Sequence, residues 1–157
     1  MRIVVPTACL LSLVSCASPP AESAKQSRTA QPAPRPKPTD ESRRFPQENL
    51  VATEVIDSAL LGKSFMPGGT LARYRKKKHE YQMFVARAGS ANEAAIAIGD
   101  WRRALASPEF VPSFGGYFGE DAGVPVFVFA KGEWIAGVVG LSRIDADAAS
   151  RSLASRL

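Results

Sequence analysis

Residues 70–88 read TLARYRKKKHEYQMFVARA, and this stretch decides the fold class. It predicts an antiparallel hairpin whose turn is formed by residues 76–79. The facing pairs are then Arg75–Glu80, Tyr74–Tyr81, Arg73–Gln82, Ala72–Met83 and Leu71–Phe84. This register gives the hairpin one mostly polar face and one apolar face, which is the pattern of a half-buried antiparallel pair.

A second hairpin is predicted over residues 124–141, around Lys131-Gly132. Its strands carry apolar side chains on both faces. These side chains are Val124, Val126, Phe127, Val128, Phe129, Trp134, Ile135, Val138 and Val139. Strands of this kind are normally covered on both sides.

A helix is predicted after each hairpin. Ser90 and Glu93 form a capping box, in which the hydroxyl and the carboxylate satisfy free amides of the first turn. Apolar residues then follow on one helical face, at Ala94, Ile98, Trp101 and Leu105. The pattern recurs from Ser142 and Asp145 onward. We therefore expect helices at 91–107 and 143–157.

The expected fold is α+β with two layers. Two hairpin–helix units, residues 70–107 and 124–157, form a four-stranded antiparallel sheet with both helices on one face. An additional N-terminal helix is predicted at 47–61, because apolar residues recur there with helical spacing. We expect this helix to cover the other face of the sheet, with a second copy of the chain or an external ligand as the alternatives. The two units align at a spacing of 52 residues, for which chance similarity is the alternative explanation.

The composition divides the 157 residues into three parts. Both cysteines lie within the first 16 residues, whereas all aromatic residues lie at Phe45 or later. Residues 17–44 contain no Ile, Leu, Val, Met or aromatic residue, so this segment cannot bury a core. We expect a signal peptide at 1–15, a disordered Pro-rich tether at 16–44 and one globular domain at 45–157.

The first segment has the features of an export signal. Arg2 precedes an apolar run that is too short for the roughly 20 residues of a membrane helix. It ends in Leu13-Val14-Ser15-Cys16, which resembles the lipobox of bacterial lipoproteins. The resemblance covers only residues 1–17. It implies attachment of diacylglycerol to the Cys16 thiol, cleavage before Cys16 and acylation of the new amino terminus. The acyl chains, such as palmitate, would then attach the protein to a membrane.

The resemblance also implies a location in the cell envelope. Ala17 follows the acylated cysteine, which favours the periplasmic face of the outer membrane over the outer face of the inner (cytoplasmic) membrane. Both cysteines are used by this interpretation, because Cys9 leaves with the signal peptide and Cys16 is acylated. The exported domain is then left without a thiol, and a nucleic acid is not expected as a partner.

The domain offers few residues for catalysis. His79 is the only histidine and lies in a predicted turn, so a metal site or a His-assisted nucleophile is not expected. Residues 112–123 are Gly-rich and contain Glu120 and Asp121. We interpret them as a mobile connection, with a weak ligand or catalytic loop as the alternative. We therefore expect a non-catalytic protein without a cofactor.

The most distinctive surface feature is a cluster of cations in the first hairpin. We call it the basic hairpin, and its residues are Arg73, Arg75, Lys76, Lys77 and Lys78. We interpret these charges first as keeping an edge hairpin soluble. The alternative is that they contact an anionic lipid, lipopolysaccharide or a teichoic-type polymer.

The sequence thus favours a membrane-anchored envelope lipoprotein with a non-catalytic domain that binds an envelope protein or polymer. One alternative is a carrier of a small apolar ligand or lipid. A less favoured alternative is an enzyme with a site in loop 112–123.

Overall fold

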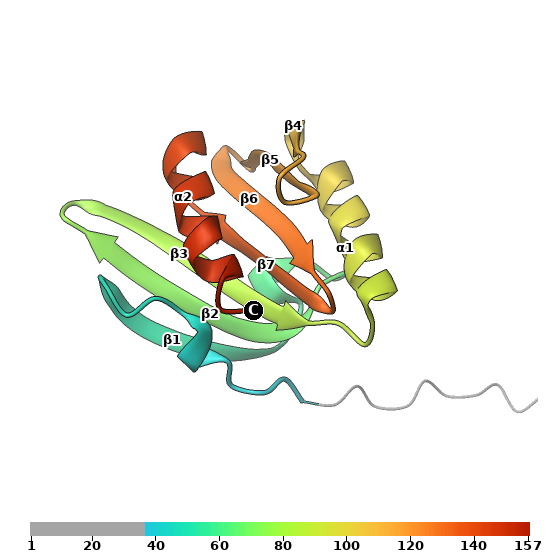
Figure 1. Cartoon of the computed structure of the whole chain (residues 1–157), viewed down its shortest axis with the longest axis horizontal. Helices are drawn as coiled ribbons and strands as arrows, with labels where there is room; N and C mark the ends of the chain where they lie inside the picture. Colours follow the sequence, from blue (N-terminus) through green and yellow to red (C-terminus); the bar gives the residue numbers. More distant parts are fainter. Residues whose placement is uncertain (1–36) are drawn as a thin grey trace, which may run out of the picture. The chain divides into compact units, whose positions relative to one another are not determined.

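The computed structural model describes residues 37–157, so the expected signal peptide, Cys16 and most of the predicted tether lie outside the described residues. The seven strands are β1 (Leu50–Ser58), β2 (Pro67–Lys76), β3 (His79–Arg87), β4 (Ala106–Val111), β5 (Gly116–Asp121), β6 (Val124–Lys131) and β7 (Trp134–Val139). The helices are α1 (Ala91–Ala104), α2 (Arg143–Ala154) and the short 3-10 turns η1 (Ser42–Arg44) and η2 (Leu60–Gly62). All strands belong to one antiparallel sheet in the order β1-β2-β3-β7-β6-β5-β4 (Figure 1).

Both predicted hairpins are present. The register of β2 and β3 is the one expected from the sequence, with Arg75 opposite Glu80 and Tyr74 opposite Tyr81. Strands β6 and β7 form the second hairpin, which closes at the pair Lys131–Trp134. Pairing between β3 and β7 joins the two hairpins into the centre of the sheet.

The expected four-stranded sheet with an N-terminal helix is wrong. Residues 47–61 form no helix of this kind; they contain the edge strand β1, which pairs with β2 and is followed by η2. The physical reason lies in the side chains, since Val51, Thr53, Val55 and Ile56 are β-branched. Such residues lose rotamer freedom in a helix and fit a pleated strand.

The segment expected as a mobile connection also contains a strand. Within residues 112–123, β5 pairs with β4 on one side and β6 on the other. Its glycines allow close packing, because a Cβ atom on Gly116 would lie 2.2 Å from the carbonyl oxygen of Val128. The preceding helix ends at Ala104, earlier than expected, and β4 begins at Ala106.

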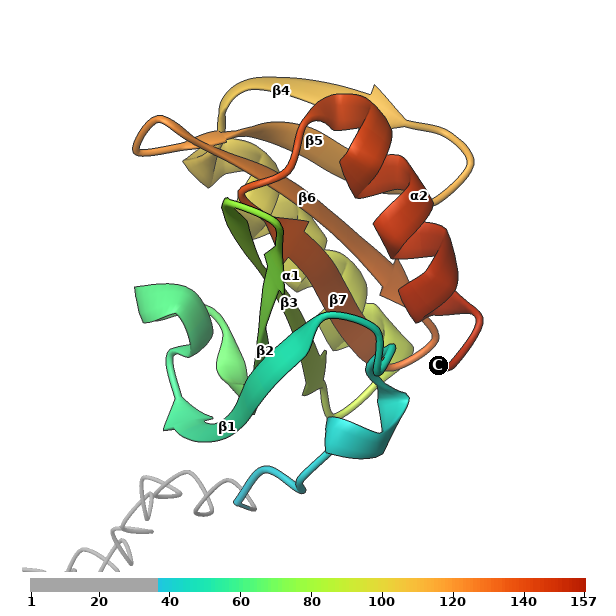
Figure 2. The same ribbon diagram turned by 90° about the vertical axis from the view of Figure 1, so that its left-hand side faces the viewer.

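The two long helices cover opposite faces of the sheet, which corrects the expectation that they share one face (Figure 2). The core beneath α1 contains Trp101, Phe84, Val126, Val128 and Ile135. The core beneath α2 contains Leu153, Val85, Phe127, Phe129 and Val138. Because the central strands carry apolar side chains on both faces, each face needs its own helix, and the domain has three layers.

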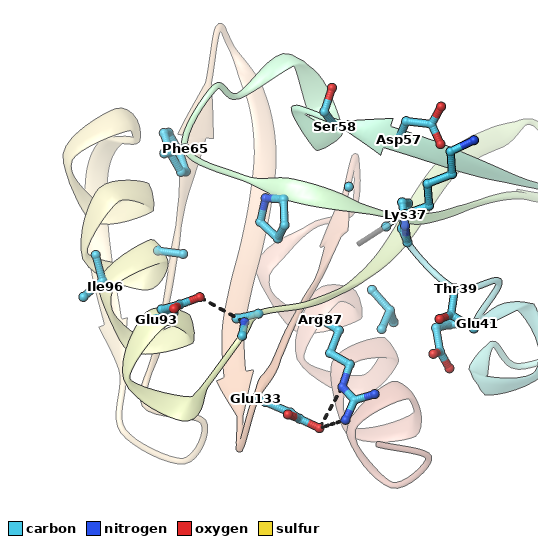
Figure 3. Close-up of a pocket in the computed structure, with 18 of the residues that line it drawn as sticks. Lys37, Thr39, Glu41, Asp57, Ser58, Phe65, Arg87, Glu93, Ile96 and Glu133 are labelled. Carbon is cyan, nitrogen blue, oxygen red and sulfur yellow. Dashed lines mark hydrogen bonds and ion pairs between the residues drawn. The ribbon is translucent and has the colours of Figure 1, made fainter. Parts of the chain in front are cut away.

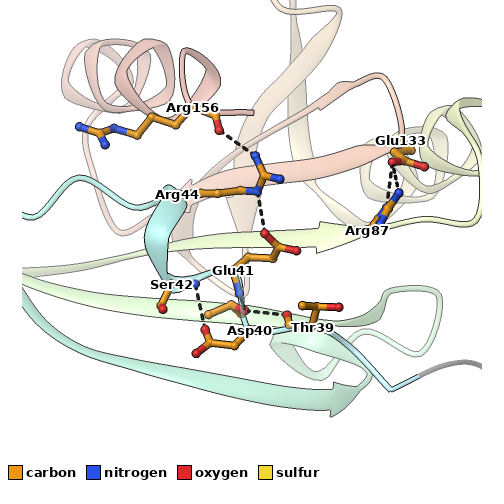
Figure 4. Close-up of polar contacts among 9 residues, drawn as sticks. Thr39, Asp40, Glu41, Ser42, Arg44, Arg87, Glu133 and Arg156 are labelled. Atoms are coloured by element: carbon orange, nitrogen blue, oxygen red, sulfur yellow. Dashed lines mark hydrogen bonds and ion pairs between the residues drawn. The ribbon is translucent and has the colours of Figure 1, made fainter.

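The residues before β1 complete the second core. Phe45 is fully buried there, among side chains that include Tyr74 and Val85. Contacts begin before the predicted boundary at residue 45, since the backbone N–H of Glu41 donates to Thr70 Oγ1 at 3.0 Å. The Arg44 guanidinium donates to the carbonyl oxygen of Arg156 at 2.9 Å, close to the Arg87–Glu133 ion pair (Figure 4).

Candidate functional site

The tip of the basic hairpin projects beyond its neighbours in the sheet. Pairing of β2 with β3 continues to Lys76 and His79. In contrast, β1 pairs with β2 only as far as Tyr74, and β7 pairs with β3 only as far as Gln82. The tip is therefore a free two-stranded ribbon at one end of the sheet (Figure 1).

The five cations of the basic hairpin divide into two groups. Arg75 donates to Glu80 at 2.8 Å through Nε, and Arg73 pairs with Glu54 at 3.2 Å. These partners are exposed, so each pair contributes at most about 1 kcal/mol. Lys76, Lys77 and Lys78 are exposed and form no ion pair with any residue between 37 and 157. Three charges at the tip are thus available to a partner.

These three lysines also determine the sign of the charge on the domain. Residues 37–157 contain 16 Lys and Arg side chains against 14 Asp and Glu side chains. Without Lys76–Lys78, 13 basic side chains would face 14 acidic ones. The net positive charge of residues 37–157 therefore depends on the tip, because acidic side chains balance the other basic ones.

Two tyrosines hold the base of this ribbon. The rings of Tyr74 and Tyr81 stack with centroids 4.9 Å apart, and Tyr74 Oη donates to the carbonyl oxygen of Pro46 at 2.9 Å. Burial raises the pKa of both phenols; the neighbouring Tyr81 raises the pKa of Tyr74 further, and Glu48 does so for Tyr81. Both groups therefore stay neutral at physiological pH, and the stack gives the lysine tip a rigid base.

A cavity of about 890 Å³ lies at the other end of β2 (Figure 3). Its walls come from residues 37–41, the end of β1, the start of β2, the end of β3 and the first half of α1, with Phe65 and Ile96 as apolar members. Several of its charged side chains already have partners within the chain. Glu93 accepts from the Gly89 N–H at 3.0 Å, and Arg87 pairs with Glu133 at 2.6 Å. This cavity could not be predicted from the sequence, because its walls come from distant segments.

The acids proposed as an alternative site in residues 112–123 do not converge. Glu120 and Asp121 are consecutive in β5, so their side chains point to opposite faces of the sheet. Asp121 Oδ1 accepts from Lys63 Nζ at 2.7 Å. Within residues 37–157, no group of three or more His, Cys, Asp or Glu side chains is arranged to hold a metal ion.

His79 lies at the tip of the first hairpin, as the sequence predicted. His79 is exposed at the start of β3, next to the lysine tip.

Neither helix of the described domain is long and apolar enough to cross a membrane. Comparison with known protein families, with curated proteins and with solved structures finds no match to this chain.

Proposed function

We propose that this chain is a lipoprotein of the cell envelope, anchored to the outer membrane through acyl chains on Cys16, and that its domain binds an anionic envelope polymer. The observation that carries the proposal is the basic hairpin, whose tip presents three lysines that form no ion pair within the described domain. Binding of this kind is electrostatic, because the tip offers no large apolar side chain.

The position of the tip supports a partner that is remote from the point where the chain joins the sheet. The N–H of Glu41 is bonded to Thr70, near the start of β2, whereas the lysines follow the end of this strand. The strand has ten residues, which corresponds to roughly 30 Å at about 3.3 Å per residue. A domain that is tethered at one end and basic at the other is suited to linking its anchor to a polymer.

The test uses the full chain in nanodiscs of zwitterionic lipid and isolated cell-wall sacculi as the polymer. We expect the chain to sediment with sacculi at low salt and to be released as the salt concentration rises, because salt screens exposed charges. The triple variant K76Q/K77Q/K78Q should lose this binding.

The matched control is K37Q/R43Q/R102Q, which removes three exposed cations elsewhere and changes the net charge equally. It should bind as the unaltered chain does. If the two triple variants lose binding to sacculi equally, the binding depends only on net charge, and the specific role of the hairpin tip is refuted. Binding to vesicles that contain phosphatidylglycerol, without binding to sacculi, would replace the polymer by a lipid surface.

The anchor is tested separately through Cys16. Cys16→Ala should leave a precursor that is not cut before residue 16 and is not labelled by palmitate. The basis is the lipobox-like sequence Leu13-Val14-Ser15-Cys16. Continued palmitate labelling of the variant would refute the anchor without affecting the role of the hairpin.

A further inference from the structure

A smaller cavity of about 450 Å³ lies between the C-terminal end of α2, the end of β6 and the turn that joins β4 to β5. It is separate from the basic hairpin and from the larger cavity. Its lining residues are Ser113, Phe114, Phe129, Ala130, Lys131, Arg151, Ala154 and Ser155. The volume is within the range of about 300–1,000 Å³ that small-molecule sites occupy.

The lining combines an apolar floor with a cationic rim. Phe114 is partly exposed there and packs on the buried Phe129 with ring centroids 4.9 Å apart, and Ala130 and Ala154 extend this surface. Both ionisable residues of the lining, Lys131 and Arg151, are cations. The cavity thus differs from the larger one, in which most of the charged lining residues are acidic.

Contacts within the chain hold the two cations at the rim. Lys131 Nζ donates to the carbonyl oxygen of Ala154 at 2.8 Å, which satisfies an acceptor at the end of α2. Arg151 Nε donates to Asp147 at 2.7 Å, and the guanidinium lies 5.3 Å from the centre of the Phe114 ring.

These contacts leave donors free for a ligand. An ammonium has three N–H donors and a guanidinium has five, and the contacts within the chain use one and two of them. The contacts within the chain therefore hold the two cationic groups in place and leave N–H donors available. Because the side chains are already held, little side-chain entropy is lost when they bind an anion.

We propose that this cavity binds a small carboxylate with an apolar body. The carboxylate accepts from Arg151 and Lys131, and the apolar body lies on Phe114, Ala130 and Ala154. The planar fork of an arginine matches the two oxygens of a carboxylate, and the absence of an acid from the lining disfavours a cationic ligand. This site is independent of the envelope polymer proposed above.

The probe is hexanoate, added to the full chain in zwitterionic nanodiscs, with empty nanodiscs as the blank. Saturation-transfer NMR follows the probe. We expect hexanoate to bind at least tenfold more tightly than hexan-1-ol, and hexylammonium to show no binding. Equal affinity for hexanoate and hexan-1-ol would overturn the proposal, because the cations would then contribute nothing.

Ser113 provides a variant that leaves the two cations and their contacts in place. Ser113 is exposed on the turn after β4 and lines the cavity. Ser113→Glu adds a negative charge to the rim and should weaken hexanoate binding at least tenfold. Ser113→Gln adds similar volume without charge and should change it less than threefold. Equal effects of the two variants would contradict the electrostatic role of the rim.

The cations are tested directly with Lys131→Gln and Arg151→Gln, each checked for an unchanged melting temperature. Each should weaken hexanoate binding about fivefold or more, while Arg102→Gln, an exposed change on α1, should leave it unaltered. A folded Arg151→Gln chain that binds hexanoate as tightly as the original would overturn the proposal. If either variant is destabilised, the comparison of the two Ser113 variants decides.

Discussion

At the scale of single residues, Ser150 is the clearest local conflict in the domain. It is fully buried on the inner face of α2, and its hydroxyl has no hydrogen-bond partner among residues 37–157. A buried polar group without a partner costs on the order of 1–3 kcal/mol, because it loses its bonds to water. Replacement of this hydroxyl by hydrogen should therefore help the fold.

We predict that Ser150→Ala raises the free energy of unfolding by about 1 kcal/mol. Urea denaturation measures the change. The control is Ser152→Ala, which is exposed on the same helix and gains only the better helix propensity of alanine, about 0.3–0.5 kcal/mol. If Ser150→Ala gains no more than the control, the hydroxyl is satisfied in solution.

Tyr74 makes the stability depend on pH in the alkaline range. Burial raises the pKa of its phenol above the ordinary value of 10.0, so the folded chain keeps a proton that the unfolded chain releases. Above about pH 10 the folded state binds more protons, and the free energy of unfolding falls as the pH rises. Below about pH 10 this contribution is fully present.

We predict that urea denaturation between pH 8 and pH 11.5 shows this decline. Tyr74→Phe removes the titrating group, so its decline above about pH 10 should be shallower. At pH 8 the variant should lose about 1 kcal/mol, because Tyr74 no longer donates to the Pro46 carbonyl oxygen. An identical alkaline slope in the variant would assign the decline to other groups.

At the scale of elements, the sequence predicts best where local chemistry fixes the structure. The helix after residue 90 begins as expected, because the Glu93 N–H donates to Ser90 Oγ at 3.1 Å and the Glu93 carboxylate accepts from the Gly89 N–H. The β2–β3 register was also predictable, since a shift by one residue would exchange the two faces.

The prediction failed where the same residues suit two elements. In residues 50–58 the apolar side chains fit a helical stripe, but the β-branched residues favour a strand, and only pairing with β2 decides between them. In residues 112–123 the glycines suggested a mobile connection, yet Gly119 lies in a strand where a Cβ atom would be 2.9 Å from the Ala106 carbonyl oxygen. Contacts with distant segments settle both cases.

We predict that Ser90→Ala lowers the free energy of unfolding by about 1 kcal/mol through loss of the helix cap.

Trp101→Ala should lower the free energy of unfolding further, by about 3–5 kcal/mol. This side chain is fully buried, and its indole N–H donates to Met66 Sδ at 3.1 Å. Thermal and urea denaturation measure both. Equally small effects would mean that α1 is not packed on the sheet in solution.

At the scale of the whole molecule, the central strands need apolar cover on both faces. The sequence predicted that both faces are covered, but it did not predict which elements cover them. The helices α1 and α2 lie on opposite faces and pack mainly against β5, β6 and β7. The second core near β2 and β3 is completed by Phe45, from the segment that precedes the first strand. The second cover, expected from a helix at 47–61, is thus provided by α2 together with Phe45.

The candidate site was predictable to a different extent. The cations of the basic hairpin follow from the sequence, but their division into paired arginines and free lysines depends on Glu54, which is brought beside Arg73 by β1. Neither cavity was predictable, because each is enclosed by segments that only the tertiary fold brings together. Local patterns locate charges, whereas concave sites require the complete topology.

The final prediction tests the cover that Phe45 provides. Phe45→Ala in the full chain should lower the free energy of unfolding by about 3–5 kcal/mol, since the ring is fully buried in the second core. It should also increase the fluorescence of an apolar dye, because truncation opens the sheet between Tyr74 and Val85 to solvent. The control is Phe110→Ala on the edge strand β4, where the ring is 53% exposed and its loss should cost much less. If the two variants melt alike and bind dye alike, the segment before β1 does not cover the sheet in solution, and the second face must be closed by another part of the chain or by a partner.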